Sequence, residues 1–132
     1  MATRIREKAL ARRKNKDNRP QGVVKYVRIS PTKVRFVLDN IRGKKAEEAL
    51  AMMQNIPHKA GDILVKLIKS VMANAEVKGL NKADLIIKET WVSPGPTMKR
   101  INIRARGRAD RVEKRSSHIT MIMEEVSAGE VK

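Results

Sequence analysis

The feature that most constrains the fold is a basic segment, residues 93–117, that lies between two runs rich in β-forming residues. The first run is LIIKETWV from Leu85, and the second is HITMIMEEV, which ends at Val126. The segment has almost no apolar alternation, so it cannot bury a face of its own. If the outer runs pair antiparallel, it becomes a hairpin of about a dozen residues per arm, turning near Arg104 to Gly107 and projecting roughly 35 to 40 Å.

This segment carries eight cations and two acidic side chains; the cations are Lys99, Arg100, Arg104, Arg106, Arg108, Arg111, Lys114 and Arg115. A solvated charged face is the ordinary alternative, but such a density destabilises a free hairpin, whereas phosphates at similar spacing would release counterions. Six of the eight are Arg, which can hold a phosphate bidentately or stack on a base. We expect Gly107 to let the backbone approach closely at the bend.

The composition of the whole chain agrees with a nucleic-acid partner. The 132 residues include 30 Lys or Arg and 14 Asp or Glu, which gives a formal net charge of +16. A polyanionic partner would neutralise this charge. With 41% hydrophobic residues, one modest core is expected. The absence of Cys excludes disulfides and favours a cytoplasmic location. We predict a single domain over residues 20–126, a short tail at 127–132, and no membrane or homo-oligomeric partner.

Residues 1–19 carry a net charge of +6 and few large apolar groups. We expect a disordered basic arm that orders on a polyanion, because such a segment buries too little surface to fold alone. A transit peptide and a cationic membrane helix are the alternatives. Glu7, Asp17, the absence of Ser and the weak apolar face all count against both.

Between the arm and the hairpin, the sequence predicts one strand over residues 23–29 and three helices. The first helix has Ser30 as N-cap and Pro31 at its first position, and it stops at Gly43. The second ends at Asn55 to Pro57, and the third ends before Gly79. Helical spacing of apolar residues supports each of them, with stripes at Val34, Val37, Leu38 and Ile41, at Ala46, Ala49, Leu50 and Met53, and at Ala60, Ile63, Leu64, Leu67, Ile68, Val71 and Ala75.

Catalytic and metal sites are poorly supported. The chain has no phosphate-binding loop, dinucleotide fingerprint, zinc-protease motif or nucleophile elbow, so we expect no enzyme, cofactor or metal. His58 and His118 lack metal-ligand spacing and are interpreted as a helix-start residue and a strand-end polar group. Trp91 is interpreted as a core or edge aromatic, with base stacking as the alternative. With only Tyr26 and Phe36 besides, the chain lacks the paired ring platform of single-strand readers.

Three blocks carry a family resemblance: SPTKVRFVLDNIRGKKAEEAL, KLIKSVMANAE and GPTMKRINIRARGRADRVEKRSSHIT. Over about Val24 to Val126 the chain closely resembles the bacterial form of ribosomal protein twenty-two of the large subunit. The resemblance implies an α+β fold of three helices packed on a small three-stranded antiparallel sheet, with a long protruding β-hairpin. It implies binding to large-subunit ribosomal RNA, beside neighbouring large-subunit proteins and with the nascent polypeptide as a further partner.

The resemblance also implies roles for particular residues. In the family the hairpin runs along the peptide exit tunnel, with its tip near the constriction and the macrolide site. That tip maps here to Met98, Lys99, Arg100, Arg104, Ala105, Arg106, Gly107 and Arg108. In the body, the family places against RNA the residues Ser30, Lys33, Arg35, Arg42, Gly43 and Lys44. The neighbouring cations Lys25, Arg28 and Lys45 are further candidates for RNA binding.

Two residues differ from the family pattern, and two alternative functions remain open. Thr32 stands where the family usually has a basic residue, and Ile103 stands where bacterial members often have Pro. The first rival is a free nucleic-acid regulator, which should present a groove-reading helix. The second is an enzyme whose site is assembled from scattered residues, which a cleft with strongly shifted titratable groups would reveal.

Overall fold

The computed structural model describes residues 2–14 and 17–126, so the expected tail at 127–132 lies outside the described residues. The order of elements is α1 (Ala2–Lys14), β1 (Gln21–Val27), α2 (Pro31–Leu38), α3 (Ala46–Asn55), α4 (Lys59–Val77), β2 (Leu85–Pro94), β3 (Met98–Ile103), β4 (Ala109–Lys114) and β5 (Ser117–Glu125). The α+β class is confirmed. The described part of the chain has one more α-helix than expected, α1.

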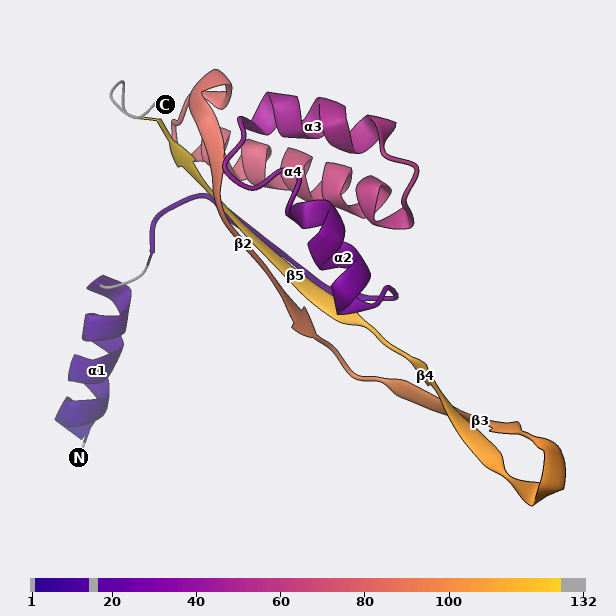
Figure 1. Ribbon diagram of the computed structural model, residues 1–132. Coiled ribbons are helices and arrows are strands. Elements are labelled where there is room, and N and C mark those ends of the chain that lie inside the picture. Colours follow the sequence, from indigo (N-terminus) through magenta and orange to yellow (C-terminus); the bar gives the residue numbers. More distant parts are fainter. Residues whose placement is uncertain (1, 15–16, 127–132) are drawn as a thin grey trace.

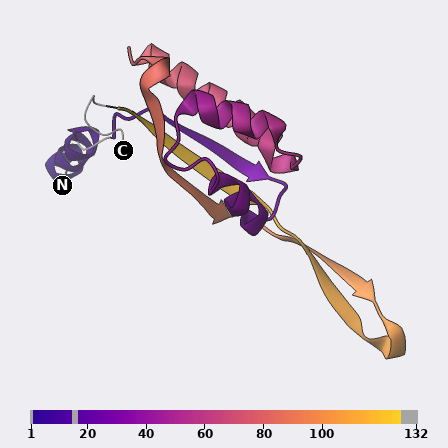
Figure 2. The same ribbon diagram turned by 45° about the horizontal axis from the view of Figure 1, so that its top comes forward.

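The strands form two separate antiparallel ladders. β5 lies between β1 and β2 in the body, whereas β3 and β4 pair only with each other. Helices α2, α3 and α4 cover one face of the three-stranded sheet, and the β3–β4 hairpin projects beyond its end (Figures 1 and 2). The expected hairpin extension is therefore present, with its turn at residues 104–108. Its paired strands have six residues each rather than the expected dozen, because Ser93, Pro94 and Ser117 pair within the body sheet.

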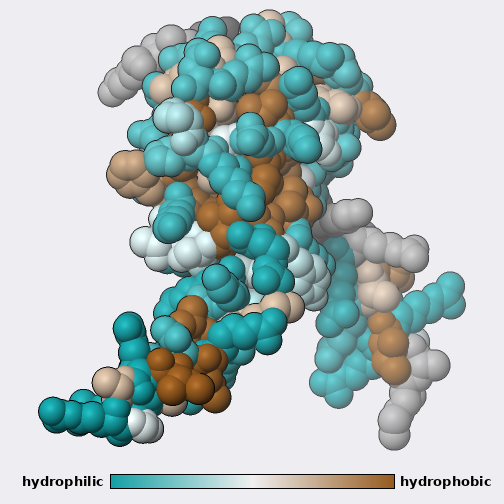
Figure 3. All heavy atoms as spheres, turned by 90° about the vertical axis from the view of Figure 1, so that its right-hand side faces the viewer, coloured by the Kyte–Doolittle hydropathy of each residue, from teal (hydrophilic) through white to brown (hydrophobic). Residues whose placement is uncertain are grey.

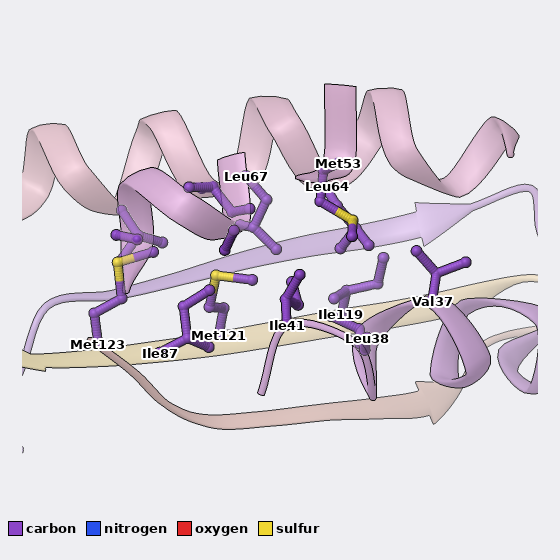
Figure 4. Close-up of a cluster of buried hydrophobic side chains, with 14 of the residues drawn as sticks. Val37, Leu38, Ile41, Met53, Leu64, Leu67, Ile87, Ile119, Met121 and Met123 are labelled. Atoms are coloured by element: carbon purple, nitrogen blue, oxygen red, sulfur yellow. The ribbon is translucent and has the colours of Figure 1, made fainter. Parts of the chain in front are cut away.

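The core lies between the central strand and the helices. Ile119, Met121 and Met123 alternate along β5 and point at the helical layer, from which Leu64 and Leu67 of α4 point back toward the sheet (Figure 4). All the apolar stripe residues named above are buried or packed against this core. α4 approaches β1 closely: a Cβ at Gly22 would lie 2.5 Å from a methyl carbon of Val71. Burial of these side chains is the main driving force for the fold.

The first predicted helix differs in detail from expectation. Ser30 occupies the N-cap position, but its hydroxyl makes no capping hydrogen bond, and its carbonyl accepts from the N–H groups of Lys33 and Val34. The helix ends at Leu38, and turns carry the chain to Gly43, whose φ of 77° suits glycine. The Gly43 N–H donates to the Ile87 carbonyl at 2.9 Å, so this connection is bonded to the sheet.

The amino-terminal segment also differs from expectation. The sequence predicts a disordered arm over residues 1–19, but Ala2–Lys14 forms α1, which lies apart from the body in Figure 1. Its Ala, Arg, Lys and Leu residues are strong helix formers, so the helix needs no apolar stripe. Ordering of this segment on RNA stays a prediction.

Residues 17–20 belong to the body rather than to an arm. Arg19 pairs with Asp17 at 2.7 Å and with Glu89 of β2 at 2.8 Å, and the carbonyl of buried Pro20 accepts from the Met123 N–H. Hydrogen bonds from Arg19 lower the pKa of Asp17 to about 2. The same contacts raise the pKa of Arg19. Residues 17–19 of the predicted arm are therefore bonded to one another and to the body, and the domain boundary at residue 20 stays a prediction.

In the part of the chain that the structure describes, no helix has both the length and the apolar character needed to cross a membrane.

Candidate nucleic-acid interface

The hairpin is exposed along its whole length and carries most of the predicted site. Its register runs from Met98 opposite Lys114 to Ile103 opposite Ala109, and every residue from 98 to 115 is exposed. The two strands bury nothing against the helices. Its cations are therefore free to meet an external surface along the whole ribbon.

The turn of the hairpin depends on two residues in the left-handed region. Arg106 has φ 59° and Gly107 has φ 71°, and the Arg104 N–H donates to the Arg108 carbonyl at 2.8 Å. Within this chain a Cβ at Gly107 would meet nothing within 4 Å, so a close backbone approach at this bend stays a prediction that concerns an external partner. The glycine supplies the backbone conformation of the turn.

Two of the eight hairpin cations are neutralised within the chain. Arg104 pairs with Asp110 at 2.8 Å, and Arg115 pairs with Glu113 at 3.0 Å. The remaining six have no ion pair with any described residue: Lys99, Arg100, Arg106, Arg108, Arg111 and Lys114. These six form the unpaired cation set of the hairpin.

The expected tip residues occupy two different places. Arg104 to Arg108, with Ala105 between them, form the turn itself. Met98, Lys99 and Arg100 lie at the opposite end of the β3–β4 ladder, next to the body, so they are not part of the tip. The family motifs give the order of these residues along the chain but not the strand register, which separates Met98 to Arg100 from the turn. A role of either group in lining a tunnel stays a prediction.

The hairpin also exposes apolar side chains. Ile101 and Ile103 are 77% and 83% exposed on one side of the ribbon, and Met98 and Val112 are about half-exposed on the other. Figure 3 shows a hydrophobic group partway along an otherwise hydrophilic extension. Ile103, which stands where the family often has Pro, pairs normally in the ladder.

In the body, three of the predicted RNA-binding cations hold the fold together. Arg35 donates to the Val92 carbonyl at 3.0 Å, and Arg42 donates to the hydroxyl and carbonyl oxygens of the buried Thr90. Lys44 contacts a methionine sulfur and pairs with Glu48. These contacts do not prevent RNA binding, but they give each side chain a structural reason for its position.

Four other predicted body cations are more available. Lys25, Lys33 and Lys45 are exposed and have no ion pair with a described residue. Arg28 is exposed and reaches the Sδ atom of Met98 at 3.3 Å, so it spans from the body to the base of the hairpin.

A cavity of about 600 Å³ lies where the body meets the hairpin. It brings together Arg28, Lys33, Lys114 and Arg115, which are far apart in sequence and were predicted only as separate cations. Sequence reasoning missed a fifth cation, Lys59, which lines the same cavity from the first residue of α4. Its position just outside the apolar stripe of that helix was the only local signal.

The aromatic and histidine residues lie outside this cavity. Trp91 is 44% exposed on the edge strand β2, so the edge interpretation is confirmed and the core interpretation is wrong. Tyr26 has a φ of 58°, and its ring meets the His118 imidazole edge-on with centroids 4.8 Å apart. His118 also accepts from the Tyr26 N–H at 2.9 Å, which explains the polar residue at this strand end. His58 is the N-cap residue of α4, as expected.

Comparisons with known proteins identify the family of this chain. The family model described as ribosomal protein L22p/L17e matches residues 22–124. A protein named large ribosomal subunit protein uL22 from Acetivibrio thermocellus is 50% identical over 108 residues, covering 81% of this chain and 86% of the relative. Proteins of the same name from Lachnospira eligens and Desulforamulus reducens are 49% and 43% identical, covering 83% of this chain and 87% and 97% of their own length. The chain therefore belongs to the ribosomal protein L22p/L17e family.

Proposed function

We propose that this protein is a structural component of the large ribosomal subunit that binds large-subunit ribosomal RNA, helps its assembly and lines the peptide exit tunnel with its hairpin turn. One observation carries the proposal: a fully exposed ribbon that pairs only with itself carries six cations without ion pairs. Such a ribbon repels itself in solution and gains order against a polyanion. Membership of a ribosomal protein family supports ribosomal RNA as that polyanion.

The mechanism is charge neutralisation and shape rather than catalysis. The relatives are ribosomal proteins and not enzymes, so the expectation of no catalytic role is confirmed by family. The available body cations Lys25, Lys33 and Lys45 would contact one region of the RNA while the hairpin reaches another. Each phosphate contact releases condensed counterions and so favours binding. One chain thereby joins separate RNA segments.

The remaining partners follow from the same assignment. Neighbouring large-subunit proteins and the nascent polypeptide would contact the surface that RNA leaves free, and the protein would act in the cytoplasm. The turn residues Arg106 and Arg108 are the strongest candidates for the tunnel wall, because they lie farthest from the body along the ladder and make no ion pair with a described residue.

The test replaces both turn arginines in assembled ribosomes. Arg106→Ala/Arg108→Ala should enter large subunits stoichiometrically, because both side chains are exposed and contribute nothing to the core. Stalling on arrest peptides and inhibition by macrolides should change relative to the parent. The matched control is Lys66→Ala/Lys69→Ala on α4, which removes the same charge from exposed positions outside the hairpin.

Two outcomes would contradict different parts of the proposal. A parent protein that does not sediment with large subunits would overturn the ribosomal role. Stoichiometric incorporation with unchanged stalling and drug response would leave the turn as an RNA scaffold and remove its assignment to the tunnel.

A further inference from the structure

The joint between the body and the hairpin is narrow. The two ladders are interrupted at residues 95–97 and 115–116. Across this gap the Gly95 N–H donates to the Ser116 carbonyl at 2.9 Å, and the Ser116 hydroxyl donates to the Pro96 carbonyl at 2.7 Å. Few hydrogen bonds therefore fix the angle at which the hairpin leaves the sheet.

The cavity of about 600 Å³ lies beside this joint and is lined from both sides. The body contributes Arg28, Lys33 and Lys59, and the hairpin contributes Lys114 and Arg115. These residues come from four separate places in the chain: the end of β1, the first turn of α2, the start of α4 and the end of β4. An occupant would touch the body and the hairpin at once.

The charge of this cavity is unbalanced. Its one acidic lining residue, Glu113, already pairs with Arg115 at 3.0 Å. Among the described residues, the hydrogen bond of the Arg28 guanidinium goes to the thioether of Met98, and Lys33, Lys59 and Lys114 have no ion pair with a described residue. Cations on opposite sides of the cavity repel each other, which favours opening of the joint unless an anion lies between them.

We infer that the cavity holds a backbone phosphate of the large-subunit ribosomal RNA, and that this phosphate fixes the angle between hairpin and body. The inference rests on the proposed function, because it names the chemical group that the RNA supplies at one place. A phosphodiester suits the lining, since guanidinium groups bind phosphate oxygens bidentately and ammonium groups bind them as point charges.

The test measures the hairpin angle directly. The chain has no Cys, so spin labels can be placed at Ala51→Cys on α3 and Ala109→Cys on β4, both exposed. In the free full-length protein the distance distribution between the labels should be broad. It should narrow on saturation with protein-free large-subunit ribosomal RNA.

The variant that tests the cavity is Lys33→Gln/Lys59→Gln, and its matched control is Lys66→Gln/Lys69→Gln. Both remove two exposed charges, and both should keep the parent's melting temperature. Saturated with RNA, the cavity variant should retain the broad distribution while the control narrows like the parent. The salt dependence of RNA affinity should also weaken in the cavity variant, by about 0.7 to 0.9 in slope if one phosphate contact is lost.

The outcomes separate this inference from the proposed function. If the parent does not bind the RNA, both fall. If the parent binds and the cavity variant narrows as fully as the control, the inference alone is overturned. If inorganic pyrophosphate narrows the distance distribution and RNA narrows it no further, the occupant is a small anion rather than an RNA phosphate. If the distribution narrows in the complete subunit but not with protein-free RNA, the occupant is an acidic protein segment. Either result would overturn the inference.

Discussion

The salt dependence of RNA binding is the sharpest quantity that the hairpin predicts. Among its eight cations, two are neutralised by Asp110 and Glu113, and six have no ion pair with a described residue. If each of the six meets one phosphate, the hairpin should contribute about −4 to −5.5 to the slope of the logarithm of the binding constant against the logarithm of salt, and contacts from the body would add to this slope. Between 50 and 200 mM salt the hairpin contacts alone correspond to a loss of roughly 300- to 2,000-fold in affinity.

The assay is filter binding of large-subunit ribosomal RNA across that salt range. Arg106→Gln/Arg108→Gln should reduce the slope by about 1.4 to 1.8, because two phosphate contacts are lost. Lys66→Gln/Lys69→Gln, with the same net charge, should leave it near the parent's value. Equal slopes for the parent and the hairpin variant would refute the reasoning that these arginines meet phosphate.

Three further predictions concern the folded protein alone. Ile119→Ala removes a buried core side chain and should lower the free energy of unfolding by about 2 to 5 kcal/mol in denaturant titration, whereas exposed Ile103→Ala should change it by less than about 0.5 kcal/mol. Gly61→Ala puts a Cβ 2.9 Å from a backbone oxygen of α3, so the melting temperature should fall despite the higher helix propensity of Ala. The pKa of Asp17 is lowered to about 2 from 3.8, so its stabilising contact should be present above pH 3.8 and lost as pH falls through about 2, as the NMR signal of the Arg19 guanidinium would report.

Apolar periodicity predicted the helices of the body well, because a helix that packs against the core on one face needs apolar residues at helical spacing. The helices at α2, α3 and α4 follow stripes that the structure buries, and the hairpin follows two β-rich runs around a segment that cannot bury anything. α1 was missed because local helix propensity, not an apolar stripe, explains it. The docking of residues 17–20 was missed because it depends on Glu89, 70 residues from Arg19.

Only the part of the candidate site whose cations cluster in the sequence could be predicted. The hairpin cations stand together in the sequence, so their shared exposure followed from composition. The separation of Met98 from the turn required the strand register. Lys59 and the cavity required the fold, because nothing near that residue in the sequence indicates that α4 begins beside the base of the hairpin.

The self-contained β3–β4 ladder has a consequence for how this protein can change over evolutionary time. Its side chains are all exposed, so substitutions along it hardly change the packing of the core. The fraction of unfolded chains, which proteases remove, therefore stays almost the same. Selection therefore acts on sequence variation at the turn mainly through the function of the assembled ribosome, and hardly through folding. The body faces the opposite selection, since a single truncated core residue such as Ile119 threatens the supply of the protein itself.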